Sequence, residues 1–228
     1  VTELIAGRLP RSLMLAAVTA ALSVPLALSI GIFSAMYRGS WLDRALNIAT
    51  LSLVAVPEFL IATLAVLLFA VRLHWLPALS YVPLDSSLSD FLRAYAMPAI
   101  TLSFVIVAQM ARMTRAAVID QLGQSYVEMA RLKGARPARV VLAHALPNAI
   151  GPIANAVALS LSYLLGGAII VETIYNYPGI ASLMVNAVTS RDMPLLQACA
   201  MIFCCAYLSL VLIADVCAIL SNPKLRNQ

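Results

Sequence analysis

The sequence predicts an all-α membrane protein with about five transmembrane helices. Of its 228 residues, 62% are hydrophobic and only 11% are charged, whereas a soluble domain carries about 25% charged residues. Five apolar stretches are long enough to cross a bilayer, which takes about 20 residues in a helix. The polar segments between them are too short for a separate soluble domain, so residues 1–228 are expected to form one transmembrane domain.

The apolar stretches set the expected spans, which cover about residues 11–37, 46–71, 96–115, 149–171 and 196–220. The second span contains Pro57, and a proline inside a helix removes a hydrogen bond and kinks it. Glu58 follows this proline at bilayer depth, where charge is costly and usually functional. Two interpretations of Glu58 stay open: a role in a path or gate through the membrane, or a structural partner for backbone groups freed at the kink.

The distribution of lysine and arginine orients the chain, because these residues are enriched on the cytoplasmic side of membrane proteins. With five spans, ten of the 15 basic residues lie on one side, namely Arg38, Arg44, Arg112, Arg115, Arg131, Lys133, Arg136, Arg139, Lys224 and Arg226. The other side holds Arg8, Arg11, Arg72, Arg93 and Arg191. Residues 38–44, 112–147 and the C-terminus are therefore expected in the cytoplasm. The N-terminus then lies outside, so we expect one further span upstream, which gives six in the natural protein.

The longest cytoplasmic segment, about residues 117–147, has a helical pattern. From Val118, apolar residues recur in steps of three and four, at Leu122, Tyr126, Met129 and Leu132. This spacing indicates an amphipathic helix. Gly134 is expected to end it, and Pro137 suits the first turn of the next helix. The residues alone leave two readings open: a protruding helix–turn–helix that meets a partner, or a solvated basic loop.

The spacing within this loop resembles a motif of ABC import permeases. In that motif, Glu-Ala-Ala is followed four residues later by glycine and about twelve residues further on by Leu-Pro. Here Glu128-Met129-Ala130, Gly134 and Leu146-Pro147 take these positions, with Met129 in place of an alanine. The run from His144 to Asn148, His-Ala-Leu-Pro-Asn, resembles the dipeptide/oligopeptide/nickel branch of that family.

Further stretches resemble the B-type permease of the same branch, in the family's order along nearly the whole chain. They are the turn 38–44, Val56-Pro57-Glu58-Phe59, Val171-Glu172-Thr173 with Tyr177-Pro178-Gly179, and Asn222-Pro223-Lys224-Leu225-Arg226. Members of the family start with one further span. The resemblance implies a type I ABC importer transmembrane domain whose loop 117–147 carries a coupling helix.

This resemblance implies a multi-pass permease subunit in a bacterial inner membrane, which moves peptides or a related small solute. Its implied partners are a second homologous permease, two cytoplasmic ATP-binding subunits and an external solute-binding protein. The chain itself is expected to be no enzyme and to need no cofactor or metal, and it lacks a Gly-x-x-x-x-Gly-Lys-Ser/Thr phosphate loop. The implied ATPase-coupling residues are Glu128, Met129, Ala130, Gly134, Leu146 and Pro147, and Glu58 is a candidate for the substrate path.

Each coupling residue has an expected role. Ala130 would permit close docking, Gly134 would set the turn between the loop helices, and Glu128 would cap or pair locally. Leu146-Pro147 would anchor the loop where it re-enters the membrane.

Three alternatives remain at this point. The same architecture could carry nickel, opines or oligosaccharides. A secondary transporter or channel would be expected to have paired intramembrane charges or inverted repeats, and neither is clear here. A membrane-embedded enzyme would need a set such as His-Glu-x-x-His or Gly-x-Ser-x-Gly, and the sequence contains neither.

Overall fold

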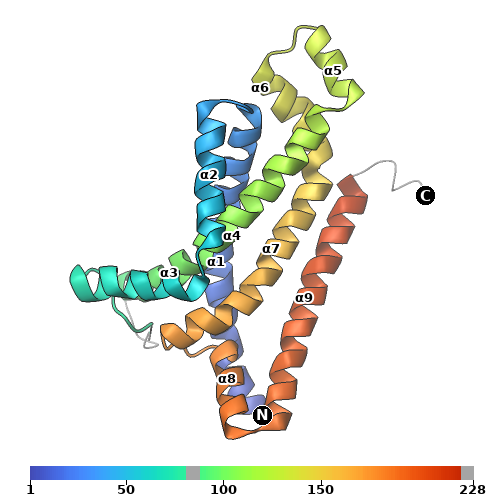
Figure 1. Cartoon of the computed structure of the whole chain (residues 1–228). Helices are drawn as coiled ribbons and strands as arrows, with labels where there is room; N and C mark the ends of the chain where they lie inside the picture. The colour runs from blue at the N-terminus through green and yellow to red at the C-terminus, as the bar shows by residue number, and fades with distance from the viewer. Residues whose placement is uncertain (81–87, 222–228) are drawn as a thin grey trace. The chain divides into compact units, whose positions relative to one another are not determined.

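The computed structural model describes residues 1–80 and 88–221, and every regular element in these two ranges is a helix (Figure 1). The all-α prediction is confirmed. The elements in chain order are α1 (Thr2–Met36), α2 (Trp41–Ala55), α3 (Glu58–Ala65), η1 (Val66–Arg72), α4 (Leu88–Leu122), α5 (Ser125–Leu132), α6 (Pro137–Arg139), η2 (Val140–Ala145), α7 (Leu146–Ile174), α8 (Ile180–Ser190) and α9 (Met193–Ser221). The basic residues Lys224 and Arg226, and the motif that begins at Asn222, lie outside the described residues.

Four helical stretches are long and apolar enough to cross a membrane: α1, α4, the stretch Pro137–Ile174, and α9. A bent pair, α2 with α3 and η1, makes a fifth when it is counted as one span. The prediction of about five transmembrane helices is confirmed. Helix α1 begins at Thr2, upstream of the expected start near residue 11, because Ile5 and Leu9 pack against an apolar cluster and extend the helix into the polar N-terminal segment.

The second expected span is interrupted at residues 56 and 57, where α2 has ended and α3 has not begun. Pro57 has an extended backbone, with ψ of 137°, and its carbonyl accepts from the amides of Leu60 and Ile61. The proline therefore starts a new helix instead of kinking a continuous one. Glu58 becomes the first residue of α3, where a carboxylate complements the positive end of the helix dipole.

The chain forms two compact units. The first unit comprises residues 1–23, 55–105 and 162–207. In this unit α8 lays an apolar face, formed by Ile180, Leu183 and Ala187, against Leu195 and Cys199. These residues recur at helical spacing, so α8 is an amphipathic helix held by its apolar face.

A buried carboxylate fixes the start of α8 in the first unit. Glu172 is 1% exposed, and its two carboxylate oxygens accept from the Ser12 hydroxyl at 2.7 Å and the Ser182 amide at 2.8 Å. The Ser12 hydroxyl oxygen also accepts from the amide of Ile180 at 2.8 Å. Two side chains from other helices thus satisfy the free amides of the first turn of α8. A Cβ at Gly179 would lie 2.0 Å from the Glu172 carboxylate, so a larger residue there would displace this carboxylate.

Two tyrosines that follow α7 are also buried in the first unit. The Tyr177 hydroxyl donates to the Arg11 carbonyl at 2.6 Å and lies 2.8 Å from the Tyr95 hydroxyl. The Tyr175 hydroxyl donates to the Ala62 carbonyl and lies 2.8 Å from the Thr101 hydroxyl. Burial raises the pKa of both phenols, so they stay protonated and can donate.

The second unit comprises residues 24–54, 106–161 and 208–228, and its core joins α1, α4, η2 and α7. The buried members of this core are Ala35, Ala117, Val118, Val141, Ala149 and Ile153. Three of the six are alanines, and small side chains let membrane helices approach closely.

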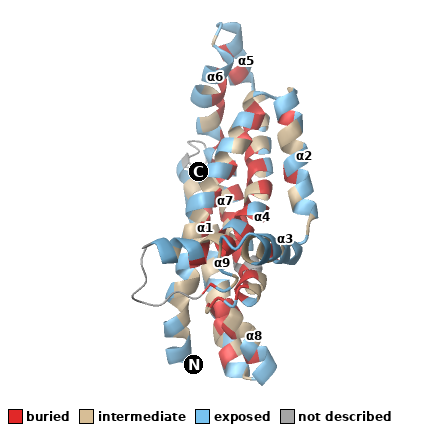
Figure 2. Ribbon diagram, turned by 90° about the vertical axis from the view of Figure 1, so that its left-hand side faces the viewer, coloured by how far each residue is buried: buried red, intermediate tan, exposed pale blue. Residues whose placement is uncertain are grey.

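Burial differs sharply between the long helices, as Figure 2 shows by colour. In the most apolar 18-residue window of α4, 61% of residues are buried, against 6% for α9. Helix α9 is predominantly apolar yet mostly exposed within the chain. Such a surface suits contact with lipid or another membrane subunit.

Candidate functional site

The cytoplasmic loop begins with a break in the helix that the sequence predicted to be continuous from Val118 to Leu132. In the structure α4 ends at Leu122 and α5 starts at Ser125. Gly123 has low helix propensity, and Gln124 has an extended backbone with φ of −82° and ψ of 147°. The Gln124 carbonyl then accepts hydrogen bonds from the amides of Val127 and Glu128 in the first turn of α5. The prediction of one helix was wrong because the apolar periodicity runs through this break without changing phase.

Helix α5 has a buried face and an exposed apolar face. Val127 and Ala130 are 0% and 9% exposed, and α5 packs against η2. The apolar residues that the sequence pattern singled out point away: Tyr126 is 41% exposed, Met129 57% and Leu132 77%. Ala130 therefore allows close packing within the chain itself. Met129 and Leu132 are therefore the members of the apolar stripe that are most open to another molecule.

Gly134 occupies the turn after α5. Its φ of +78° lies in the left-handed region, which side chains with a Cβ resist. Its amide donates to the Arg131 carbonyl at 2.9 Å, and the next amide, of Ala135, donates to the Ala130 carbonyl at 3.2 Å. This pair of bonds is the Schellman arrangement, which closes a helix C-terminus and reverses the chain.

Leu146 and Pro147 stand where the loop rejoins the long helix α7. They directly follow the π-helical segment η2. Pro147 has no amide to donate within a helix, and a wider local turn relieves its clash with the preceding carbonyls. The Asn148 side chain donates to the His144 carbonyl at 3.0 Å. Leu146 packs against the core of the second unit, so the loop and this core are continuous.

Tyr126 links three elements at the base of the loop. Its hydroxyl donates to Gln121 Oε1 at 2.8 Å, at the end of α4. It also interacts with the Asn148 side chain at the start of α7. Partial burial raises the pKa of the Tyr126 phenol although the Asn148 hydrogen bond lowers it, so the hydroxyl stays protonated and keeps its donor. Sequence reasoning placed Tyr126 on an apolar stripe and missed this polar contact.

Glu128 and Glu58 both stand at helix starts. Glu128 is exposed in the first turn of α5. Glu58 is half-buried at the start of α3. Each carboxylate complements the positive end of its helix.

A second polar cluster, which the sequence analysis did not single out, surrounds Asp43. This carboxylate is 3% exposed and accepts two parallel bonds from Arg115, at 2.8 Å from Nε and 2.9 Å from Nη2. It also accepts from the Ser34 hydroxyl, the Gly39 amide and the Asn47 amide group. Bidentate arginine–carboxylate pairs are strong and geometrically specific. The cluster fastens the turn between α1 and α2 to α4.

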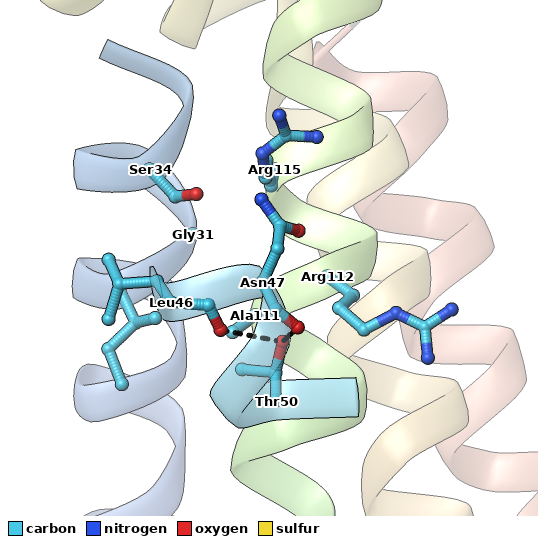
Figure 3. A pocket seen from close by; sticks show the side chains of 9 residues that line it. Gly31, Ser34, Leu46, Asn47, Thr50, Ala111, Arg112 and Arg115 are labelled. Atoms are coloured by element: carbon cyan, nitrogen blue, oxygen red, sulfur yellow. Dashed lines mark hydrogen bonds between the residues drawn. The ribbon is translucent and has the colours of Figure 1, made fainter. Parts of the chain in front are cut away.

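Figure 3 shows the pocket beside this cluster, with Asn47 between Arg115 and Thr50. The Thr50 hydroxyl donates to the carbonyls of Leu46 and Asn47, at 2.9 and 3.1 Å. The cavity volume is about 10 Å³, which is room for at most one water. The pocket is therefore a packing gap and cannot hold a solute.

Comparison with known proteins decides the family. Residues 27–227 match the family described as the binding-protein-dependent transport system inner membrane component. The chain belongs to this family. Its members are permease components of inner membranes, so this permease is a multi-pass inner-membrane protein. Its segment from α5 to η2 occupies the position of the loop 117–147 that the sequence predicted between two spans.

Permeases named for peptide and glutathione transport match this permease over almost all of its 228 residues. The "Probable peptide ABC transporter permease protein y4tP" of Sinorhizobium fredii is 33% identical over 99% of this chain and 72% of that protein. The glutathione transport system permease protein GsiC is 34% identical in Escherichia coli (strain K12), over 99% of this chain and 71% of that protein. In Pectobacterium atrosepticum it is 35% identical over the same shares. The expected ABC permease family is confirmed.

A solved structure shares the fold. A chain from the "Crystal structure of an amino acid ABC transporter with histidines" matches with a TM-score of 0.69 and 16% identity, over 100% of this permease and 95% of that chain. The expected ABC importer transmembrane fold is confirmed by this likeness.

Proposed function

We propose that this chain is the transmembrane subunit of an ATP-driven importer, which moves peptides or a related small solute by alternating access. One observation carries the proposal. Tyr126, Met129 and Leu132 form an exposed apolar face on α5, while Val127 and Ala130 hold the same helix to its own chain. An exposed apolar patch on a fixed cytoplasmic element fits a protein partner. In the proposal that partner is an ATPase subunit, and this chain hydrolyses no ATP itself.

The proposal gives each loop residue a role. Met129 contacts the ATPase subunit, Ala130 lets α5 lie close to η2, and Gly134 sets the turn. Glu128 stabilises the first turn of α5 through the helix dipole. Leu146-Pro147 joins the loop to the core of the second unit. Movement of α5 is then passed to α4 and α7 as a rigid-body displacement.

The complete transporter in this proposal has five components: this chain, a second homologous permease, two ATPase subunits and an external solute-binding protein. Peptides are favoured as cargo because the relatives are named as peptide and glutathione permeases. Nickel, opines or oligosaccharides fit the same architecture. Calorimetry on the solute-binding protein that co-purifies with the assembled transporter would identify the cargo.

The apolar face of α5 can be tested by placing charge on it. We expect the double variant Met129→Asp/Leu132→Asp to lose the ATPase subunits on purification and to lose ATP-dependent peptide uptake in proteoliposomes. The matched control is Val188→Asp on α8, which is 58% exposed but lies outside the loop. Retention of the ATPase subunits and of uptake by the double variant would refute the docking role. Uptake driven by an ion gradient without ATP would instead identify a secondary transporter.

A further inference from the structure

A cavity of about 540 Å³ lies at the base of the cytoplasmic loop, within the second unit. This volume falls within the range of about 300–1,000 Å³ that is typical of small-molecule sites. Its apolar lining residues include Met36, Leu122 and Val140. Its two charged lining residues are Arg38, from the turn after α1, and Arg131, from α5.

Both arginines lack a counter-charge within the described ranges. The ion pair recorded there is Arg115 with Asp43, and no acidic residue lines the cavity. Arg38 and Arg131 are also exposed. Two arginines that line one cavity without a carboxylate favour an anionic ligand. Arginine suits phosphate because its planar donors bind two oxygens at once.

The surroundings of Arg38 indicate where that anion comes from. Arg38 follows the apolar helix α1, and it is flanked by Tyr37 and Trp41, which are 50% and 83% exposed. Aromatic side chains of this kind gather at the headgroup level of a membrane. The apolar lining residues of the cavity suit the acyl chain of a lipid. An acidic side chain of a soluble partner would leave these apolar residues uncovered.

We propose that this cavity binds the headgroup of an anionic phospholipid from the cytoplasmic leaflet. The lipid phosphate lies between Arg38 and Arg131, and the start of an acyl chain follows the apolar wall. Basic pockets between transmembrane helices on the cytoplasmic side bind such headgroups. Because Arg131 belongs to α5, the lipid would brace the loop against the end of α1.

The test measures lipid retention by the full chain together with the subunits that co-purify with it. The protein is placed in nanodiscs of phosphatidylcholine with increasing phosphatidylglycerol, and bound phosphatidylglycerol is counted by native mass spectrometry. The double variant Arg38→Gln/Arg131→Gln is expected to bind phosphatidylglycerol about 30-fold more weakly, as expected for two basic side chains near an anionic surface. The control Arg136→Gln/Arg139→Gln removes the same charge from exposed positions that do not line the cavity, and it should bind normally.

Three results would overturn the proposal. The first is equal weakening in the control, which would indicate general charge attraction. The second is displacement of phosphatidylglycerol by millimolar inorganic phosphate, which would assign the cavity to a soluble phosphate. The third is loss of the ATPase subunits from Arg38→Gln/Arg131→Gln in pure phosphatidylcholine, which would assign it to an acidic segment of that partner. The main readout is bound lipid and not uptake, so failure of this proposal can be distinguished from failure of the proposed transport function.

Discussion

The turn at Gly134 gives a prediction whose size follows from the structure. Gly134 has a φ of +78°, and a Cβ added there would meet no heavy atom within 4 Å. The cost of Gly134→Ala is therefore the backbone cost of a left-handed residue, about 1–2 kcal/mol, without a steric contribution. That cost lowers the equilibrium for the intact turn by a factor of about 5–30. Gly134→Val should cost more, because a β-branched side chain resists this conformation further.

The assay compares ATP-dependent uptake in proteoliposomes with the amount of permease inserted in the membrane. We expect uptake to be highest in the wild type, lower in Gly134→Ala and lowest in Gly134→Val. Insertion should stay normal, because the turn lies outside the spans. Gly7→Ala is the matched control: Gly7 is not in the left-handed region and lies outside the loop, and its added Cβ would also meet no heavy atom within 4 Å. Wild-type uptake by Gly134→Val would refute the idea that this turn holds the coupling loop in shape.

Three further perturbations address the two units separately. Asp43→Asn should destabilise the second unit by about 3 kcal/mol, since it leaves Arg115 without its carboxylate. Thermal unfolding would measure this loss of stability, and an unchanged melting temperature would contradict the prediction. Gly179→Ala should lower the melting temperature, because its Cβ would displace the buried Glu172 carboxylate from the start of α8. Glu172→Gln should lower the melting temperature by a smaller amount. If both variants melted at the wild-type temperature, the capping role of Glu172 would be disproved. Glu58→Gln should leave uptake unchanged if the carboxylate only supports the start of α3, whereas slowed uptake by a fully assembled transporter would place it on the substrate path.

Much of the fold could be predicted from the sequence because lipid imposes simple rules. A span needs a long apolar run, and the backbone inside lipid has to be helical. These rules gave the helical class, the number of spans and the cytoplasmic loop. Gly134 could be placed at a turn because a glycine after an amphipathic helix commonly ends it.

The failures have a common cause. Periodicity shows which residues share a helix face, but it does not show where a helix is interrupted. The apolar spacing from Leu122 to Tyr126 continues across the break at Gly123, so the spacing gave no sign that the helix ends there. The pair Asp43–Arg115 joins residues 72 positions apart, and a single sequence carries no signal for such a contact. Glu172 was noticed only as part of a resemblance, although it is the buried cap of α8.

The geometry of the loop bears on how force could reach the membrane helices. A loop that moved independently would carry α5 without displacing anything else. Here Val127 and Ala130 are buried, and α5 packs against η2, while the Tyr126 hydroxyl holds the end of α4. Segment η2 contributes Val141 to the core that also contains Ala35 of α1. Because close-packed interiors transmit displacement instead of absorbing it, a pull on the exposed face of α5 would move the second unit as one body.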